Sequence, residues 1–248
     1  MDAILLAEAV RVIKQAKRTV AFTGAGISVE SGVPAFRGEN GLFAQYDPAC
    51  FDINYFDIHP EEAWKAIKTT FYDNFSCAVP NAAHESLAEM ERLGYLQGVI
   101  TQNIDHLHQK AGSKDVTEFH GSSQRLVCRG CGHTMRVEEV ILENLPPRCG
   151  DCHAFLKPDF VFFGESIPPQ AYRRAVSETL AADVWLVIGT TGEVMPASTL
   201  PLEAKRNGKT LIEVNIQPSN YTEDVTDIYL EGKATEVLQL LLAELMKN

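Results

Sequence analysis

The sequence has no long hydrophobic run, no excess of basic residues and no internal repeat, and each absence argues against a class of protein. No apolar stretch approaches the roughly 18 residues of a membrane-spanning helix. Lys and Arg number 22 against 33 Asp and Glu, whereas a nucleic-acid-binding surface is basic. Residues 1–20 lack the apolar core and the small-residue cleavage site of a secretory signal. We therefore expect a cytoplasmic protein that binds neither membrane nor nucleic acid.

The composition that remains is typical of a soluble globular protein. Hydrophobic residues make up 45% of the 248 residues and charged residues 22%. This length fits one sizeable domain, or one domain that carries an inserted lobe.

Cysteine is scarce, with six in the chain, but four of the six form two Cys-x2-Cys pairs. The 17 residues between the pairs match the spacing of a structural zinc site. Disulfides or a thioredoxin-like redox pair are alternatives, but disulfides need an oxidising compartment. The adjacent His133 and His153 could each replace a sulfur, which four available cysteines make unnecessary. The sequence thus predicts a zinc ion bound by Cys128, Cys131, Cys149 and Cys152.

Apolar segments alternate with amphipathic ones on both sides of the cysteine pairs. Short apolar runs predict buried strands at 19–22, 96–101, 184–188, 210–214 and 228–230. Apolar residues at helical spacing, with Pro and Gly as boundaries, predict helices at 3–17, 60–76, 81–93 and 234–246. This alternation is typical of an α/β fold with a doubly wound parallel sheet. The zinc-binding segment would interrupt that sheet.

Small or polar residues follow four of the predicted strands. In a doubly wound sheet, ligands bind at the carboxyl ends of the strands. We therefore expect one crevice lined by Thr23-Gly-Ala-Gly26, Thr101-Gln-Asn-Ile-Asp105, Gly189-Thr-Thr-Gly192 and Asn215.

The first of these turns, Gly24-Ala25-Gly26, would let the backbone approach a pyrophosphate closely. The dinucleotide motif G-x-G-x-x-G is incomplete, because Val29 stands at the third glycine position. The acidic residue expected at a strand end about 20 residues later is also missing. A hydride-transferring dehydrogenase therefore fits badly, and we expect a dinucleotide bound in another way.

Several motifs together resemble those of the sirtuins, the NAD-dependent protein deacylases of bacterial and archaeal type. Residues 24–38 are similar to the family's signature loop and residues 101–108 to its second signature. His120-Gly121 matches the catalytic histidine and its glycine, and residues 158–165 (PDFVFFGE) resemble the substrate-cleft segment. The four cysteines match the family's zinc site, and residues 189–191, 194–197 and 214–215 match later nucleotide contacts. The resemblance runs from about residue 19 to residue 240.

The resemblance implies a Rossmann-like NAD-binding domain with an inserted small zinc-binding lobe and a helical module. The NAD-binding domain would comprise residues 1–38, 80–122 and 158–248. Residues 39–79 would form the helical module and residues 123–157 the zinc-binding module of the small lobe. The implied activity is transfer of an acyl group from a modified lysine to ADP-ribose, with release of nicotinamide. The expected protein is a monomer that acts on an acylated-lysine peptide or protein.

The resemblance also implies roles for individual residues. His120 would act as the base, with Asn103 as a second catalytic residue. Phe36 would shield the reactive ribose, and Arg37 would pair with phosphate. The NAD contacts would be Gly24, Ala25, Gly26, Ser28, Val29, Phe36, Arg37, Gln102, Asn103, Ile104, Asp105, His120, Gly189, Thr190, Thr191, Asn215, Lys233 and Ala234. The substrate contacts would be Val161, Phe162, Phe163, Gly164 and Glu165, in an extended segment able to add a strand to a bound peptide.

Local alternatives accompany these assignments. His120 could be a satisfied core histidine, and Asp105 could cap a helix. Ala35 stands where the family usually has Asp, which puts the rate of turnover in doubt. Members that remove succinyl groups carry a Tyr and a nearby Arg, but Tyr72 has no Arg beside it, which favours an uncharged acyl group. ADP-ribosyl transfer to protein and a non-enzymatic zinc-ribbon module are the alternative functions.

Overall fold

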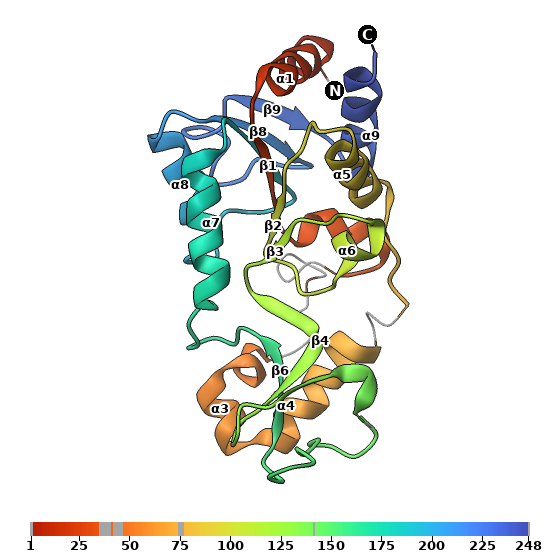
Figure 1. Ribbon diagram of the computed structural model, residues 1–248, viewed down its shortest axis with the longest axis vertical. Helices are drawn as coiled ribbons and strands as arrows, with labels where there is room; N and C mark the ends of the chain where they lie inside the picture. The colour runs from red at the N-terminus through yellow and green to blue at the C-terminus, as the bar shows by residue number, and fades with distance from the viewer. Residues whose placement is uncertain (1, 35–40, 42–46, 74–76, 141, 248) are drawn as a thin grey trace.

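The larger lobe is built on a six-stranded sheet in which every strand pairs in parallel with its neighbours (Figure 1). The computed structural model describes residues 2–34, 41, 47–73, 77–140 and 142–247. The strands, in spatial order, are β3 (Val116–Glu118), β2 (Val99–Thr101), β1 (Thr19–Thr23), β7 (Val184–Ile188), β8 (Thr210–Asn215) and β9 (Ile228–Glu231). The predicted doubly wound sheet is confirmed.

Helices cover both faces of this sheet, because alternate residues of each strand point to opposite sides. One face carries α1 (Ala3–Gln15), α5 (Ala82–Arg92) and α9 (Ala234–Leu245). The other carries α7 (Pro169–Ala181) and α8 (Thr199–Arg206), and Figure 1 shows these two beside each other. The short helices η1 (Ala25–Ser31, 3₁₀) and α6 (Leu107–Ala111) follow β1 and β2 at the carboxyl edge.

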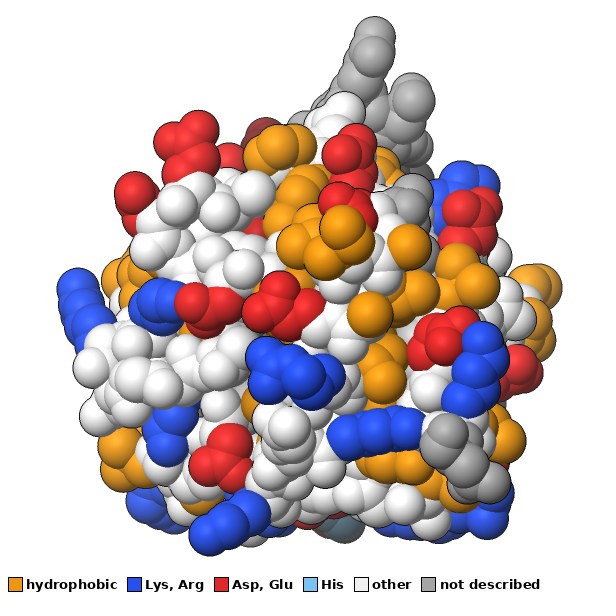
Figure 2. All heavy atoms as spheres, turned by 90° about the horizontal axis from the view of Figure 1, so that it is seen from above, with side chains coloured by type: hydrophobic (Ala, Val, Ile, Leu, Met, Phe, Trp, Pro, Cys, Tyr) orange, Lys and Arg blue, Asp and Glu red, His pale blue; other side chains and the backbone are white. Residues whose placement is uncertain are grey.

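The end of the molecule that carries both termini has charges of both signs interspersed with apolar side chains (Figure 2). There α1 lies against α9, and the Lys14 ammonium donates to the Lys247 carbonyl at 2.6 Å. Within the described residues, none of the helices has the length and apolar character needed to cross a bilayer.

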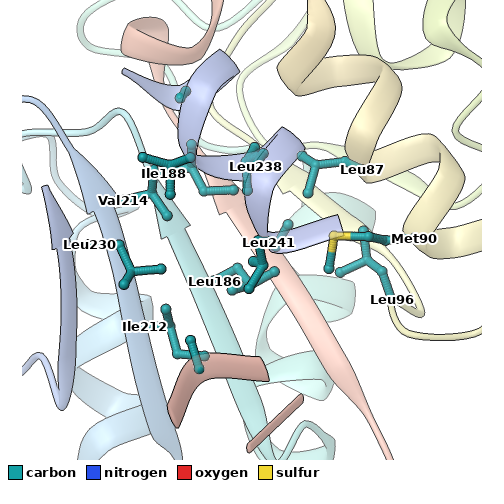
Figure 3. Packing of buried hydrophobic residues seen from close by; sticks show 14 of the residues in the cluster. Leu87, Met90, Leu96, Leu186, Ile188, Ile212, Val214, Leu230, Leu238 and Leu241 are labelled. Carbon is teal, nitrogen blue, oxygen red and sulfur yellow. The ribbon is translucent and has the colours of Figure 1, made fainter. Parts of the chain in front are cut away.

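Figure 3 shows how the α9 face of the sheet packs. Leu238 and Leu241 of α9 lie against Leu186 and Ile188 of β7, and all four are fully buried. Burying each such side chain contributes about 1.5–3 kcal/mol. Trp185 and Val187, which alternate with them, are buried on the opposite face.

The smaller lobe combines two parts of the chain that are far apart in sequence. The first comprises η2 (Pro48–Phe51), α3 (Ile53–Ile58), α4 (Pro60–Ile67) and the π-helical η3 (Lys68–Asp73). The second comprises β4 (Gly121–Cys128), β5 (Thr134–Arg136), η4 (Val137–Glu139) and β6 (Leu156–Phe160), whose strands form an antiparallel sheet. Both contribute to one core, in which the Trp64 indole donates to the Leu156 carbonyl at 2.7 Å. The predicted boundaries at 122/123 and 157/158 fall inside β4 and β6, and the division into domains stays a prediction.

Some elements differ from expectation. The helix predicted over 60–76 ends as α4 at Ile67 and continues as the π-helical turn η3, while residues 74–76 lie outside the described part of the chain. The strand predicted over 96–101 is shorter and begins at Val99. Helices α7 and α8 were not predicted, because their apolar faces are narrow and broken by polar residues.

Candidate active site

The order of the sheet reverses between β1 and β7, and the main cavity of the described residues opens at this point. This central cavity has a volume of about 810 Å³ and extends to the small lobe. The turns after β1 and β7 touch here, and a Cβ on Gly26 would lie 2.7 Å from the Gly189 Cα. Only glycine permits so close an approach. The convergence of strand ends that the sequence predicted is confirmed for the turns after β1, β2, β7 and β8.

A buried polar network joins the turns after β1 and β2. The Asn103 amide donates to the Gly24 carbonyl at 3.1 Å and to Ser28 Oγ at 3.2 Å. Ser28 Oγ in turn donates to Asp105 Oδ2 at 2.7 Å. Burial raises the pKa of Asp105, against the opposing effect of its hydrogen bonds from Leu107 and Ser28. The Asp105 Oδ1 accepts from the Leu107 N–H at the start of α6, but the N-cap residue is His106, so the structure does not place Asp105 at the N-cap.

His120 lies where β3 meets β4 and lines the central cavity. Its Nδ1 is 3.0 Å from the Gln102 carbonyl, which can only accept, so Nδ1 carries the proton. Nε2 is then left with a lone pair. Burial lowers the pKa of His120, partly opposed by this hydrogen bond, so the ring is neutral near pH 7. The imidazole is therefore prepared to accept a proton at Nε2.

The structure describes all the NAD contacts predicted from the sequence except Phe36 and Arg37. Those it describes lie on the cavity wall, except Ser28 and Asp105, which lie behind it. The Gln102 amide donates to Thr190 Oγ1 at 3.1 Å, and the Asn215 amide donates to the Thr190 carbonyl at 3.0 Å. Lys233, just before α9, pairs with Glu30 at 3.2 Å. Phe36 and Arg37 lie outside the described residues, as does Ala35.

The substrate-cleft segment, Val161–Glu165, lines the cavity throughout. Its backbone already has a partner on one side, because the Phe163 N–H donates to the Phe51 carbonyl at 2.8 Å and the Phe163 carbonyl accepts from Ile53 at 3.0 Å. A peptide that adds a strand here would have to use the other edge of the segment. The Phe163 side chain is 46% exposed.

Aromatic side chains that sequence reasoning missed close the cavity toward the small lobe. Phe51 and Phe71 line it, and their rings meet edge-on with centroids 5.4 Å apart. The Phe71 ring also contacts Phe160 at 5.0 Å. No local pattern marked Phe51 or Phe71, since only the docking of the helical module brings them to the cavity.

Two histidines lie buried behind the cavity and were not assigned a role from sequence. His84 Nε2 is 3.3 Å from Ser28 Oγ, and His108 Nε2 is 2.9 Å from Thr23 Oγ1. Their rings meet edge-on, with centroids 5.0 Å apart. Burial lowers the pKa of His84 to about 4, so its ring is neutral at physiological pH.

The four paired cysteines gather at the far end of the small lobe. Their Sγ atoms all lie within 4.8 Å of one another, with Cys128 to Cys152 at 3.3 Å and Cys131 to Cys149 at 3.8 Å. A zinc tetrahedron with Zn–S bonds of 2.3 Å has S–S edges of about 3.8 Å. Backbone N–H groups, first that of Cys131, lower the pKa of Cys128 and favour the thiolate that a metal requires. The sulfur atoms thus have the number, type and spacing that fit zinc.

Comparison with known proteins identifies the family. The family model described as "Sir2 family" matches residues 24–196. An "NAD-dependent protein deacetylase 1" of Pyrobaculum aerophilum is 43% identical over 242 residues, covering 97% of this chain and 94% of that protein. An "NAD-dependent protein deacylase" of Pyrococcus furiosus is 40% identical over 254 residues, covering 98% of this chain and 99% of that protein.

Solved structures agree with this assignment. A Sir2 with a p53 peptide and NAD⁺ superposes with a TM-score of 0.89 at 38% identity, covering 96% of this chain and 98% of that chain. A Sir2 mutant with a deacetylated p53 peptide and 3'-O-acetyl ADP-ribose superposes with a TM-score of 0.91 at 37% identity, again covering 96% of this chain and 98% of that chain. The resemblance inferred from the motifs is confirmed, and the chain belongs to the Sir2 family, the sirtuins.

Proposed function

We propose that this protein is an NAD-dependent protein lysine deacylase, which transfers the acyl group of a modified lysine to ADP-ribose and releases nicotinamide. The observation that carries the proposal is His120, whose Nδ1 proton is held by the Gln102 carbonyl while its ring lines the cavity. The relatives named as deacetylases and deacylases, and the Sir2 structures with NAD and p53 peptide, support the same activity.

The residues of the cavity fit NAD. A volume of about 810 Å³ suits a ligand of dinucleotide size, and polar groups line it at the ends of four strands. Gly24, Gly26 and Thr190 would hold the phosphates and riboses, and Asn215 would contact the adenine ribose. As the family resemblance implies, Ile104 on the cavity wall and Asp105 directly behind it would hold the nicotinamide amide, since a carboxylate accepts from an NH₂ group. When bound, NAD supplies an electrophilic ribose carbon and the acceptor for the acyl group.

The protein's own part in the reaction is positioning and proton transfer. His120 would take a proton at Nε2 from a ribose hydroxyl, because its Nδ1 is already protonated. Asn103, held by Gly24 and Ser28, would orient the ribose. The apolar walls would exclude water and so favour acyl transfer over hydrolysis.

The lining of the cavity favours an uncharged acyl group. Phe51, Phe71 and Phe160 form an apolar end beside the substrate segment. Among the described lining residues, Lys233 alone carries a full positive charge, and Glu30 pairs with it. Tyr72 stacks on Trp64 in the core of the small lobe and does not line the cavity.

Zinc bound by Cys128, Cys131, Cys149 and Cys152 belongs to the proposal as a structural ion. Four thiolates leave no open position for a reacting group, so its task would be to hold the small lobe together. We also propose a cytoplasmic monomer that binds neither nucleic acid nor membrane; the net charge of −11 supports only the lack of nucleic-acid binding. Size-exclusion chromatography with light scattering would then give about the chain mass of 27.4 kDa.

The test is incubation of the purified protein with NAD and an acetyl-lysine peptide, followed by mass spectrometry. We expect the peptide with an unmodified lysine, acetyl-ADP-ribose and nicotinamide as products. His120→Ala should lower the rate of deacetylation about 100-fold or more. His59→Ala, which removes an exposed histidine of the small lobe, is the matched control and should keep the wild-type rate. A peptide that gains ADP-ribose would favour the transferase alternative, and deacetylated peptide formed no faster than by His120→Ala would contradict the proposal.

A further inference from the structure

Lys157, in β6, is a buried lysine that the proposed reaction does not use. Its side chain is only 3% exposed. The three protons of its ammonium group have three acceptors: the Pro158 carbonyl at 2.8 Å, the Phe160 carbonyl at 2.7 Å and Glu165 Oε2 at 2.9 Å. An ammonium group has three donors and no acceptor, so this one is fully satisfied. Lysine is almost never fully buried without such partners, and the site is therefore built around the cation.

Two of the three acceptors, those of Phe160 and Glu165, belong to residues that line the substrate side of the central cavity, whereas Pro158 does not. Phe160 directly precedes the substrate-cleft segment and Glu165 ends it, and Lys157 binds both. The Glu165 carboxylate also accepts from the Phe162 N–H at 2.9 Å, and the Glu165 N–H donates to the Phe162 carbonyl at 3.0 Å. The Phe162 ring, 2% exposed, lies with its centroid 4.0 Å from the ammonium nitrogen. The segment thus folds round one charge, which lies against the apolar core of the small lobe to which Phe160 and Phe162 belong.

The arrangement is local, which separates it from an ordinary core contact. The hydrogen bonds of the ammonium group stay within residues 157–165 and reach neither the six-stranded sheet nor the helical module. Phe163, between the two ends, is then presented to the cavity with its side chain 46% exposed. Burial lowers the pKa of Lys157, and the nearby Glu165 charge opposes this effect only in part. Loss of the ammonium group would therefore change the shape of the substrate segment while leaving the NAD side of the cavity intact.

We propose that Lys157 is a positioning residue for the acylated-lysine substrate: it fixes the turn from Phe160 to Glu165 and acts on the substrate only through that turn. The inference rests on the proposed deacylase function for its substrate, but the effect on the turn can be measured without turnover.

The main test compares Lys157→Met with the wild type, because methionine keeps a similar length and lacks the charge and the donors. With the acetyl-lysine peptide, we expect KM for the peptide to rise about 10-fold or more, with KM for NAD within about twofold. Lys209→Met is the matched control, since the Lys209 ammonium also donates to a carbonyl, that of Leu180, but far from the cavity; its peptide KM should not change. Glu165→Gln keeps an acceptor oxygen and should have a smaller effect of the same kind.

The second readout is amide hydrogen exchange across residues 160–165, measured in the absence of substrates. Exchange there should be about 10-fold faster in Lys157→Met than in the wild type, with β1 and β7 unchanged. Unchanged exchange in this segment would overturn the proposal, as would an equal rise of both KM values. If the wild type lacks deacylase activity, the proposed function fails while the exchange result still decides the role of Lys157. If Lys157→Met does not fold, Glu165→Gln carries the same two measurements.

Discussion

At the scale of single residues, burial sets the protonation of the groups around the central cavity. Asp105 is 7% exposed and its pKa is raised by desolvation, although Ser28 and Leu107 both donate to it. A carboxylate in this position costs free energy that an amide would not. In our proposal the carboxylate has a task that needs a negative charge, which is recognition of the nicotinamide amide.

Asp105→Asn should therefore separate stability from activity. We expect kcat/KM for NAD to fall about 10- to 100-fold, because a hydrogen bond to a charged group is worth about 1.5–3 kcal/mol. The free energy of unfolding of the variant, relative to the wild type, should rise as the pH increases from about 4. The sign follows from the raised pKa of Asp105, since the native state binds this proton more tightly than the unfolded chain. Urea unfolding between pH 4 and pH 8 measures the difference, and a difference independent of pH would contradict the expectation.

The local sequence predicted that Asp105 is either a ligand contact or a helix N-cap; the structure puts His106 at the N-cap of α6, one residue later, while Asp105 accepts from the Leu107 N–H. The sequence pattern could not predict His84, because nothing local distinguishes it from a surface histidine of an amphipathic helix. It is buried because α5 packs on the sheet next to the turn that carries Ser28. Contacts of this kind depend on the path of the whole chain.

At the scale of elements, the close approach of the turns after β1 and β7 creates the cavity. A Cβ on Gly26 would lie within 3.0 Å of three backbone atoms of Gly189. The backbone of both turns would have to move apart, and the polar groups that follow each strand would move with them.

Gly26→Ala should consequently lower the free energy of unfolding by about 1–3 kcal/mol and abolish detectable NAD binding. Gly208→Ala is the control for an added methyl group: Gly208 has a positive φ of +73°, unlike Gly26, and a Cβ there meets nothing within 4 Å. Gly208→Ala should lower the free energy of unfolding by about 1–2 kcal/mol, because of the backbone conformation alone, and should leave the affinity for NAD unchanged. Chemical unfolding and calorimetric titration with NAD would test both, and wild-type NAD affinity in Gly26→Ala would disprove the argument.

The antiparallel sheet of the small lobe should depend on zinc. Cys128 and Cys149 are buried in the core that the helical module shares, so removal of a metal there would disturb both parts of the lobe. Metal analysis should find one zinc per chain, and Cys149→Ser should lose it. In that variant, amide exchange should increase in β4 and β6 and, through the Trp64 contact with Leu156, in α4, but not in β7. Absence of zinc from the wild type, or unchanged exchange, would contradict this view.

At the scale of the whole molecule, the neutral buried histidines should make stability depend on pH. The pKa of His84 is lowered from 6.5 to about 4 in the folded protein, so the unfolded chain binds its proton more readily. The free energy of unfolding is therefore not reduced by His84 above about pH 6.5. As the pH falls toward 4, protonation of His84 in the unfolded chain lowers the free energy of unfolding by at most about 3 kcal/mol. His84→Asn should show a weaker fall in the free energy of unfolding over this interval. Urea unfolding at several pH values measures both slopes, and equal slopes would count against the buried neutral ring.

The sequence by itself determined the strands β1, β7, β8 and β9, the glycine turn, the cysteine pairs and the polar residues that follow the strands. These features are encoded by short-range periodicity and spacing, which act before distant segments meet. Only the tertiary structure decided that Phe51 and Phe71 close the cavity, that Phe163 pairs with the helical module, and that the chain folds round the Lys157 ammonium group. The reason is physical: each of these arrangements depends on which surfaces and buried polar groups become neighbours when the small lobe and the sheet pack, and that is a property of the whole chain.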